Sequence, residues 1–263
     1  MNPDASGGNE KEIRMNYNEN LSGNQTRELF PTLWNTGEEL NRAVSACLAR
    51  VFVRMFAALL VTAGAALAVA TFDTLQALVF RSIYTVYGLI ILELVLVVAI
   101  SARINTLSNT TANVMFFLYA LLNGLTLSVI FFVYELGTIY NAFAVSALMF
   151  AAMAIYGTIT RRDLTSIGSM CMMGLFGIII ASVVNIFLRN NMLDAIICYI
   201  GVVVFIGLTA YDTQRIKRML EGANATSHTE AIQKISVMGA LALYLDFINL
   251  FLKILRIFGR RRN

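Results

Sequence analysis

Charged residues, proline and histidine are all scarce in this chain of 263 residues. Charged side chains make up 14% of it and hydrophobic residues 58%, whereas about a quarter of the residues in soluble domains are charged. This balance excludes an ordinary soluble globular domain. Two prolines in all, with glycines scattered inside apolar runs, are typical of closely packed membrane helices. The single histidine, His228, lies in a polar segment and cannot build a metal site alone.

Motifs for common catalytic and redox chemistry are also absent. Cys47, Cys171 and Cys198 lie in or beside apolar segments without a CxxC or Cys/His grouping, so we expect them to be small buried hydrophobes. No HExxH, GxSxG or Walker pattern occurs. The sequence therefore predicts neither an enzyme nor a resident cofactor. The formal charge of +4 comes mostly from loops and tails, which indicates membrane topology rather than nucleic-acid binding.

The chain divides into a polar N-terminal part and an apolar remainder. Residues 1–46 are rich in Asn, Glu, Gly and Ser and lack a signal-peptide pattern, so they are predicted to be a flexible tail. Residues 47–263 are predicted to be an all-α integral membrane domain. They contain seven apolar segments of about 20 residues, enough for each to cross a ~30 Å core. The segments are 51–72, 83–102, 114–134, 139–160, 167–188, 195–215 and 235–252.

Lysine and arginine in the loops predict a cytoplasmic N-terminus. In that orientation the internal loops hold seven of these residues and the opposite loops only two, Arg81 and Arg189. The C-terminal tail breaks the pattern, because an odd number of spans puts its basic residues outside. Either the last segment does not cross fully or the earlier loops outweigh the tail.

Ionisable residues inside apolar spans are candidates for function. Asp246 lies within the last span, on a helix face shared with Gly239, Ala242, Asn249 and Lys253. A carboxylate at such depth requires compensation by a partner. The other candidates are Asp212 at the end of the sixth span, Glu93 in the second span and Arg103 at its end.

Asp212 and Asp246 are predicted to form a pH-sensing pair. Both helices approach the same loop, and if the sixth helix continues past Arg215 the two carboxylates lie at similar depth. Two carboxylates in a dry site cannot both ionise cheaply, so the pair would share a proton. Loss of that proton would put repulsion between two helices, which a cation or an arginine could relieve.

Structural alternatives remain open for each of these residues. Asp212 could cap a helix end or pair with Arg215. Glu93 could pair with Arg54 or Arg103. The asparagines of the spans, Asn123, Asn185 and Asn249, are more often interhelical hydrogen-bond donors and acceptors than ligands.

An intramembrane aspartyl protease would also use two membrane aspartates. Tyr211-Asp212 matches half of the pattern that such enzymes carry, but the Gly-x-Gly-Asp element is absent, and Leu245-Asp246 does not supply it. Peptide-bond cleavage is therefore a minor alternative.

Two stretches carry a resemblance to a known family. They are Phe205-Ile206-Gly207-Leu208-Thr209-Ala210-Tyr211-Asp212-Thr213-Gln214 and Ala242-Leu243-Tyr244-Leu245-Asp246-Phe247-Ile248-Asn249-Leu250-Phe251, supported by Arg162-Asp163-Leu164 and Leu255-Arg256-Ile257-Phe258-Gly259. With seven spans, the chain from about 50 to 261 resembles the bacterial branch of the Bax inhibitor-1 family, the transmembrane Bax inhibitor motif proteins.

The resemblance implies six helices around a central seventh, in the bacterial inner membrane. It also implies a pH-sensitive calcium leak gated by two aspartates that match Asp212 and Asp246. In some members an arginine at the end of the second span pairs with the first aspartate, and Arg103 lies one residue from that position. A family glutamate matches Glu93.

Two functions are expected, from different classes. The first is a calcium leak, in which Asp212, Asp246 and Asn249 supply transient oxygen ligands. The alternative is a non-conducting protein that modulates a membrane-bound AAA protease, as the resemblance implies for some bacterial members, or that supports stress survival. Lipid is the expected surrounding, and no nucleic-acid partner is expected.

Overall fold

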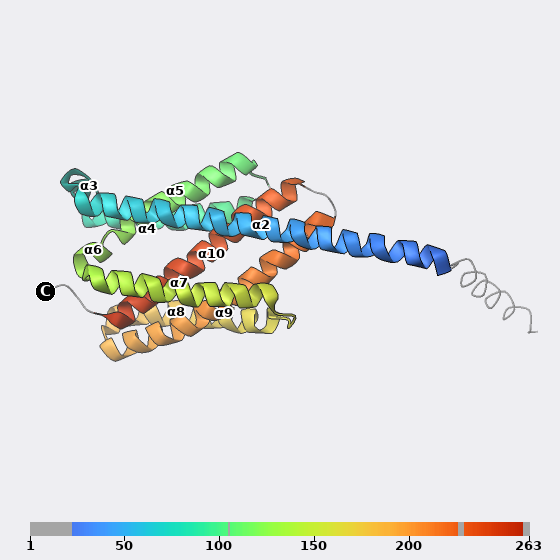
Figure 1. Cartoon of the computed structure of the whole chain (residues 1–263). Coiled ribbons are helices and arrows are strands. Elements are labelled where there is room, and N and C mark those ends of the chain that lie inside the picture. The colour runs from blue at the N-terminus through green and yellow to red at the C-terminus, as the bar shows by residue number, and fades with distance from the viewer. Residues whose placement is uncertain (1–22, 105, 226–228, 260–263) are drawn as a thin grey trace, which may run out of the picture. The chain divides into compact units, whose positions relative to one another are not determined.

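The computed structural model describes residues 23–104, 106–225 and 229–259, where the regular secondary structure is α-helical (Figure 1). The all-α class predicted from the sequence is therefore confirmed for this part of the chain. The helices are α2 (Gly23–Thr71), α3 (Asp73–Val79), α4 (Ile83–Arg103), α5 (Asn109–Leu127), α6 (Ile130–Val133), α7 (Leu136–Ile159), α8 (Thr165–Leu188), α9 (Asn191–Ala225) and α10 (Thr229–Phe258).

Seven segments within the described ranges are long and apolar enough to cross a membrane, which confirms the predicted number of spans. Their helices extend further than the predicted spans, most clearly at the end of α9 and the start of α10. Backbone hydrogen bonding continues there into polar sequence. The segments are Glu39–Thr71, Ile83–Arg103, Asn109–Val133, Leu136–Ile159, Thr165–Leu188, Asn191–Ala223 and Glu230–Phe258.

The third span consists of two helices, α5 and α6, separated by a break at Ser128 and Val129. The Ser128 hydroxyl donates to the carbonyl of Leu125 at 2.6 Å. The amide of Phe131 donates to the carbonyl of Ser128, three residues back, at 3.1 Å. The tighter pattern ends the α-helix while keeping backbone groups paired inside the span, where unpaired groups are costly.

Helix α2 already begins at Gly23, so residues 23–46 of the expected tail are helical. Residues 1–22 lie outside the described part, and the flexibility expected for 1–46 stays a prediction. The chain divides into two compact units, Met1–Ser45 and Ala46–Asn263. The second unit contains the apolar parts of all seven spans and every candidate functional residue.

Helix α10 is the most buried span of the second unit. In its most apolar stretch 67% of the residues are buried, whereas the values for the other six spans lie between 11% and 39%. It packs against α9, α7 and α5, and Figure 1 shows it crossing the bundle obliquely. Residues on α10 are therefore largely withdrawn from lipid.

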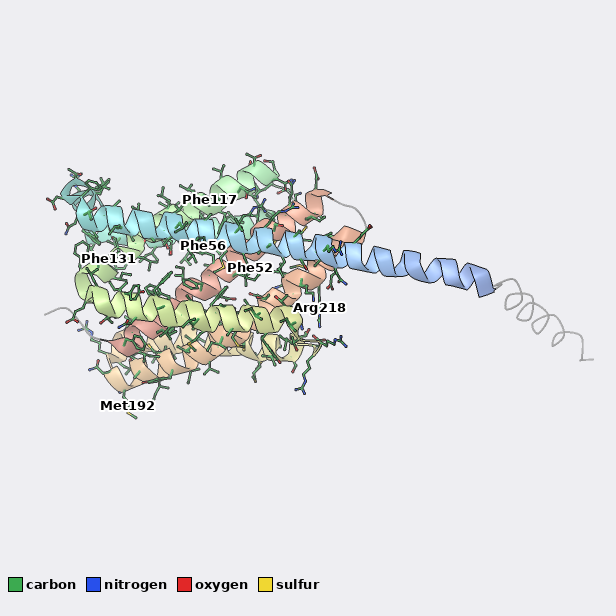
Figure 2. All side chains as sticks on the ribbon, in the orientation of Figure 1. Phe52, Phe56, Phe117, Phe131, Met192 and Arg218 are labelled. Atoms are coloured by element: carbon green, nitrogen blue, oxygen red, sulfur yellow. The ribbon has the colours of Figure 1, made fainter. Side chains whose placement is uncertain are left out.

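The outward faces of the other helices carry apolar side chains. Figure 2 shows Phe56 of α2 and Met192 of α9 on the outside of the helices, and they are 60% and 74% exposed. Large exposed apolar side chains also cover α4 and α8. Such faces are suited to contact with lipid tails.

Two glycines allow α7 and α8 to approach α9 closely. Gly157 of α7 lies against the backbone carbonyl of Ala210, and Gly168 of α8 lies against the ring of Tyr211. In both places a Cβ atom would overlap its neighbour. Because Ala210 and Tyr211 directly precede Asp212, these contacts fix the segment of α9 that carries this carboxylate.

We expect Gly157→Ala to destabilise the protein by about 1–3 kcal/mol, because the added methyl group meets backbone that cannot move aside alone. The control is Gly177→Ala on α8, where no heavy atom lies within 4 Å of the added Cβ. Alanine favours a helix over glycine by about 1 kcal/mol, so the control should be equally or more stable than the wild type. Thermal unfolding in detergent, followed by circular dichroism, measures both. Equal stability of the two variants would contradict the close approach of α7 and α9.

Candidate functional site

Asp212 and Asp246 lie on neighbouring antiparallel helices at similar depth. Gly239 of α10 packs on Ile216 of α9, where an added Cβ would lie 3.0 Å from the isoleucine side chain. Asp212 lies four residues before Ile216 on α9, and Leu243 lies four residues after Gly239 on α10. Because the two helices are antiparallel, Asp212 and Leu243 are at the same level. Asp246 is three residues further, which is about 5 Å along the helix axis. The expected similar depth is therefore found, because α9 continues well past Arg215.

The Asp246 carboxylate is buried, with at least one oxygen unpaired in the described part of the chain. Its residue is 5% exposed, and its Oδ2 atom has no hydrogen-bond partner among the residues that the structure describes. Asp212 is half-buried, and the two groups are close enough for their charges to interact. A buried ionised carboxylate is costly without partners. Two such groups can share one proton or take up a passing cation.

The alternative structural roles of Asp212 do not agree with its surroundings. Helix α9 spans Asn191–Ala225, so Asp212 lies far from either end and the capping interpretation is wrong. Arg215 is exposed and acts on Asp212 electrostatically, but the two do not form an ion pair within 4.0 Å. Asp212 therefore remains available to the Asp246 carboxylate.

Glu93 is part of a hydrogen-bond network whose other members are neutral side chains. Asn123 of α5 donates to its Oε2 at 3.0 Å, and the Thr126 hydroxyl donates to its Oε1. Glu93 forms no ion pair with Arg54 or Arg103, so both interpretations that paired it with an arginine are wrong. Its role in the structure is to join α4 to α5.

The same network continues to α10 and α2. The Tyr244 hydroxyl donates to Oδ1 of Asn123 at 3.0 Å and lies 2.6 Å from the Thr62 hydroxyl. The Thr62 hydroxyl also donates to the carbonyl of Ala120 at 2.9 Å. The interhelical role expected for Asn123 is thus confirmed, and four helices are joined two residues before Asp246.

Arg103 and Asn249 do not contact the aspartate pair in this structure. Arg103 is exposed at the end of α4 and forms no ion pair with either aspartate. The pairing of Arg103 with the first aspartate, which the resemblance implied, is therefore absent from this conformation. Asn249 donates to the carbonyl of Leu245 in its own helix at 2.8 Å.

Asn249 lines a cavity of about 540 Å³ that we call the end cavity, at the C-terminal end of α10. Its remaining wall is built by α5, α6 and the first turns of α9. Apolar side chains and polar ones share the lining. The polar ones are Thr126, Tyr134, Asp194, Asn249, Lys253 and Arg256.

The described residues contain no group of three or more His, Cys, Asp or Glu side chains that could hold a metal ion. Asp212, Asp246 and Asn249 together offer fewer groups than the six to eight oxygen ligands of a resident Ca²⁺. The three side chains therefore fall short of a complete Ca²⁺ coordination shell.

Gln214, which lies two residues after Asp212, was not among the predicted site residues. Its Oε1 accepts from the amide of Leu164 at 3.0 Å, and its Nε2 donates to the carbonyl of Arg162 at 2.8 Å. Lys217 donates to the carbonyl of Thr158 at 2.9 Å. These contacts tie the connection between α7 and α8 to α9. Only the position of Gln214 in the family motif pointed to it.

Asp163 reinforces this connection outside the spans. Its Oδ1 accepts from the hydroxyl of Thr165 at 2.7 Å, from the amide of Thr165 at 3.0 Å and from Arg218 at 2.9 Å. These hydrogen bonds, those of Thr165 first, lower the pKa of Asp163 from 3.8 to about 2. The side chain therefore stays ionised at every pH near neutrality.

The lowered pKa of Asp163 predicts a pH-dependent difference between the wild type and Asp163→Asn. Since the folded-state pKa is the lower one, the stabilisation is complete above pH 4 and is lost as the pH falls toward 2. Melting temperatures of both proteins from pH 2 to 7 test this. A constant difference over the whole range would contradict the assignment.

We expect Tyr244→Phe to destabilise the protein by about 1 kcal/mol, because it removes a hydroxyl that serves two buried partners. Tyr199→Phe on α9 is the matched control, since Tyr199 is 62% exposed. Unfolding free energies in bicelles measure both changes. If the two substitutions change the unfolding free energy equally, the network does not stabilise the protein.

Comparison with known proteins agrees with these features. The family model described as "Inhibitor of apoptosis-promoting Bax1" matches residues 44–263. The chain is 48% identical to the inner membrane protein YbhL of Escherichia coli over 215 residues, which cover 82% of this chain and 92% of YbhL. It is 44% identical over 216 residues to a protein of Borreliella burgdorferi, covering 82% and 92% of the two chains. A Rickettsia prowazekii protein is 41% identical over 216 residues, covering 81% and 89%.

The resemblance seen in the two aspartate-bearing stretches therefore extends over the whole second unit. The matched region begins two residues before the unit boundary and includes all the helices that surround the candidate site. The chain is a multi-pass inner membrane protein that belongs to the Bax inhibitor-1 family.

Proposed function

We propose that this protein is a pH-sensitive cation leak, with Ca²⁺ as a permeant ion, controlled by the Asp212–Asp246 pair. The observation that carries the proposal is a buried Asp246 oxygen without a hydrogen-bond partner among the described residues, beside a second carboxylate. A purely structural carboxylate would have its oxygens satisfied, as those of Glu93 are.

The proposed control depends on the charge across the interface of α9 and α10. With one proton shared, the pair carries a single negative charge and the two helices can remain close. When the proton leaves, two negative charges face each other across a buried interface, and the interface must open or admit a cation. Oxygen atoms of the two carboxylates and of Asn249 are ligands that Ca²⁺ prefers.

The proposed architecture has α10 at the centre of the other six spans, with the N-terminus in the cytoplasm. High burial of α10, its packing on α9, α7 and α5, and the Tyr244–Thr62 hydrogen bond to α2 support the central position. Seven basic residues in the helix ends and connections on one side, against two on the other, support the orientation.

The end cavity supports a path for the ion. Asn249 lies in its wall and is one helical turn from Asp246 on α10. Thr126 lies in the same wall and donates to Glu93. A cation in the end cavity would thus need to pass a single turn of α10 to reach the aspartate pair.

The rival function is a non-conducting protein that modulates a membrane-bound AAA protease. Its carboxylate pair would act on partner binding rather than on ion flow. Conduction distinguishes the two functions directly.

The experiment reconstitutes the protein in liposomes and follows Ca²⁺ influx from pH 5 to 8. We expect the wild-type leak to change with pH, by at most about tenfold per pH unit because a single proton is shared. Asp246→Asn, which keeps the shape and removes the charge, should make the leak independent of pH.

The matched control is Asp163→Asn, because Asp163 has a pKa of about 2 and does not titrate between pH 5 and 8. This variant should keep the wild-type pH response. An unchanged pH response in Asp246→Asn would remove the gating proposal. If neither the wild type nor either variant conducts Ca²⁺ at any pH, the non-conducting rival function is favoured.

A further inference from the structure

The end cavity contains an unbalanced charge that the proposed function does not use. Asp194 contributes one negative charge, and Lys253 and Arg256 contribute one positive charge each, which leaves a net charge of +1. Arg256 is neutralised, since its Nη1 lies 2.7 Å from Oδ1 of Asp194. The uncompensated charge is therefore the Lys253 ammonium, which has no hydrogen bond or ion pair with any residue in the described ranges.

The Lys253 side chain lies between two helices and does not simply extend along the lipid-facing surface. Its methylene chain lies flat on Gly201 of α9, where a Cβ would come within 3.1 Å of three of its carbon atoms. The ammonium is close enough to interact electrostatically with Asp194 and Arg256. The close packing of the chain on a glycine keeps the charge at the wall of the end cavity.

We propose that Lys253 makes the end cavity a charge filter, which disfavours divalent cations and limits the leak. This inference rests on the proposed function, because it concerns the path to the aspartate pair. Coulomb repulsion from the ammonium acts twice as strongly on Ca²⁺ as on a monovalent ion. Asp194 reduces the positive charge of the end cavity by neutralising Arg256. Asp194 and Lys253 therefore have opposite effects on the passage of Ca²⁺.

The test compares Ca²⁺ influx at constant pH 7 into liposomes of zwitterionic phosphatidylcholine at low salt. Lys253→Met keeps a long apolar chain on Gly201 and removes the charge, and it should raise the influx about fivefold. Asp194→Asn leaves both basic groups without their counter-charge and should lower it. Both changes in influx should be smaller in about 0.5 M salt, because the salt screens these charges.

Arg81→Gln is the matched control for a charge lost at the same end of the bundle. Arg81 is exposed, and it follows Phe80, whose ring packs on Phe132 of α6 at 5.7 Å. It does not line the end cavity, so its loss should leave the influx unchanged. Changes of the same sign in Lys253→Met and Asp194→Asn, or no change in either while the wild type conducts, would overturn the filter.

A second measurement is independent of conduction. In a chain whose Cys47, Cys171 and Cys198 are replaced by alanine, Asn249→Cys puts a thiol in the end cavity. Val129→Cys, at another lining position that is 44% exposed, serves if the first variant does not elute as a folded protein. Rates with a cationic and an anionic methanethiosulfonate reagent are measured in detergent, where both ends are accessible.

The filter predicts that adding Lys253→Met raises the ratio of the cationic to the anionic rate about threefold or more. Adding Arg81→Gln should leave the ratio unchanged. If no protein conducts but the ratio rises, the proposed leak fails while the charge of the cavity stands as assigned. If the ratio does not rise, the filter is overturned whatever the leak assay gives.

Discussion

The burial of one carboxylate is the constraint on which the rest of this structure depends. Asp246 lies in the most buried helix, with one oxygen unpaired among the described residues. Moving an isolated charge to such a place costs several kcal/mol or more. The described parts of the surrounding helices form no ion pair with it; they bring a second acid, Asp212, to within one turn. Two neighbouring acids in such a place are stabilised by a proton or a cation, and the proposed control of the leak rests on this requirement.

Much of the fold and part of the site could be predicted from the sequence. Runs of apolar residues revealed seven spans, because crossing lipid requires a fixed length of apolar helix. The depth of Asp246 followed from the same runs, and the resemblance in the two motifs pointed to Asp212. The sixth span was predicted to end before α9 does, and the seventh to begin after α10 does. Apolarity marks the lipid-embedded part of a helix and not the end of its hydrogen bonding.

The contacts between distant residues could not be predicted. Glu93 was expected to need a positive charge, yet hydroxyl and amide groups of α5 satisfy it. Its partners Asn123 and Thr126 look like ordinary polar residues of a span, and nothing in their spacing identifies the residue that they face. For Arg103 the family pattern suggested a pairing with Asp212, but the side chain lies exposed at the end of α4. Which groups meet depends on helix packing, and a single sequence does not report that packing.

The Gln214 contacts join the buried aspartate to the surface of the protein. Gln214 lies little more than half a turn after Asp212 and holds both neighbours of Asp163 in the connection between α7 and α8. Since a helix is stiff over so short a length, any rotation or shift of α9 at the pair must also displace this connection. If the pair acts as proposed, a change at the buried α9–α10 interface would therefore also reach a connection that lies outside the spans.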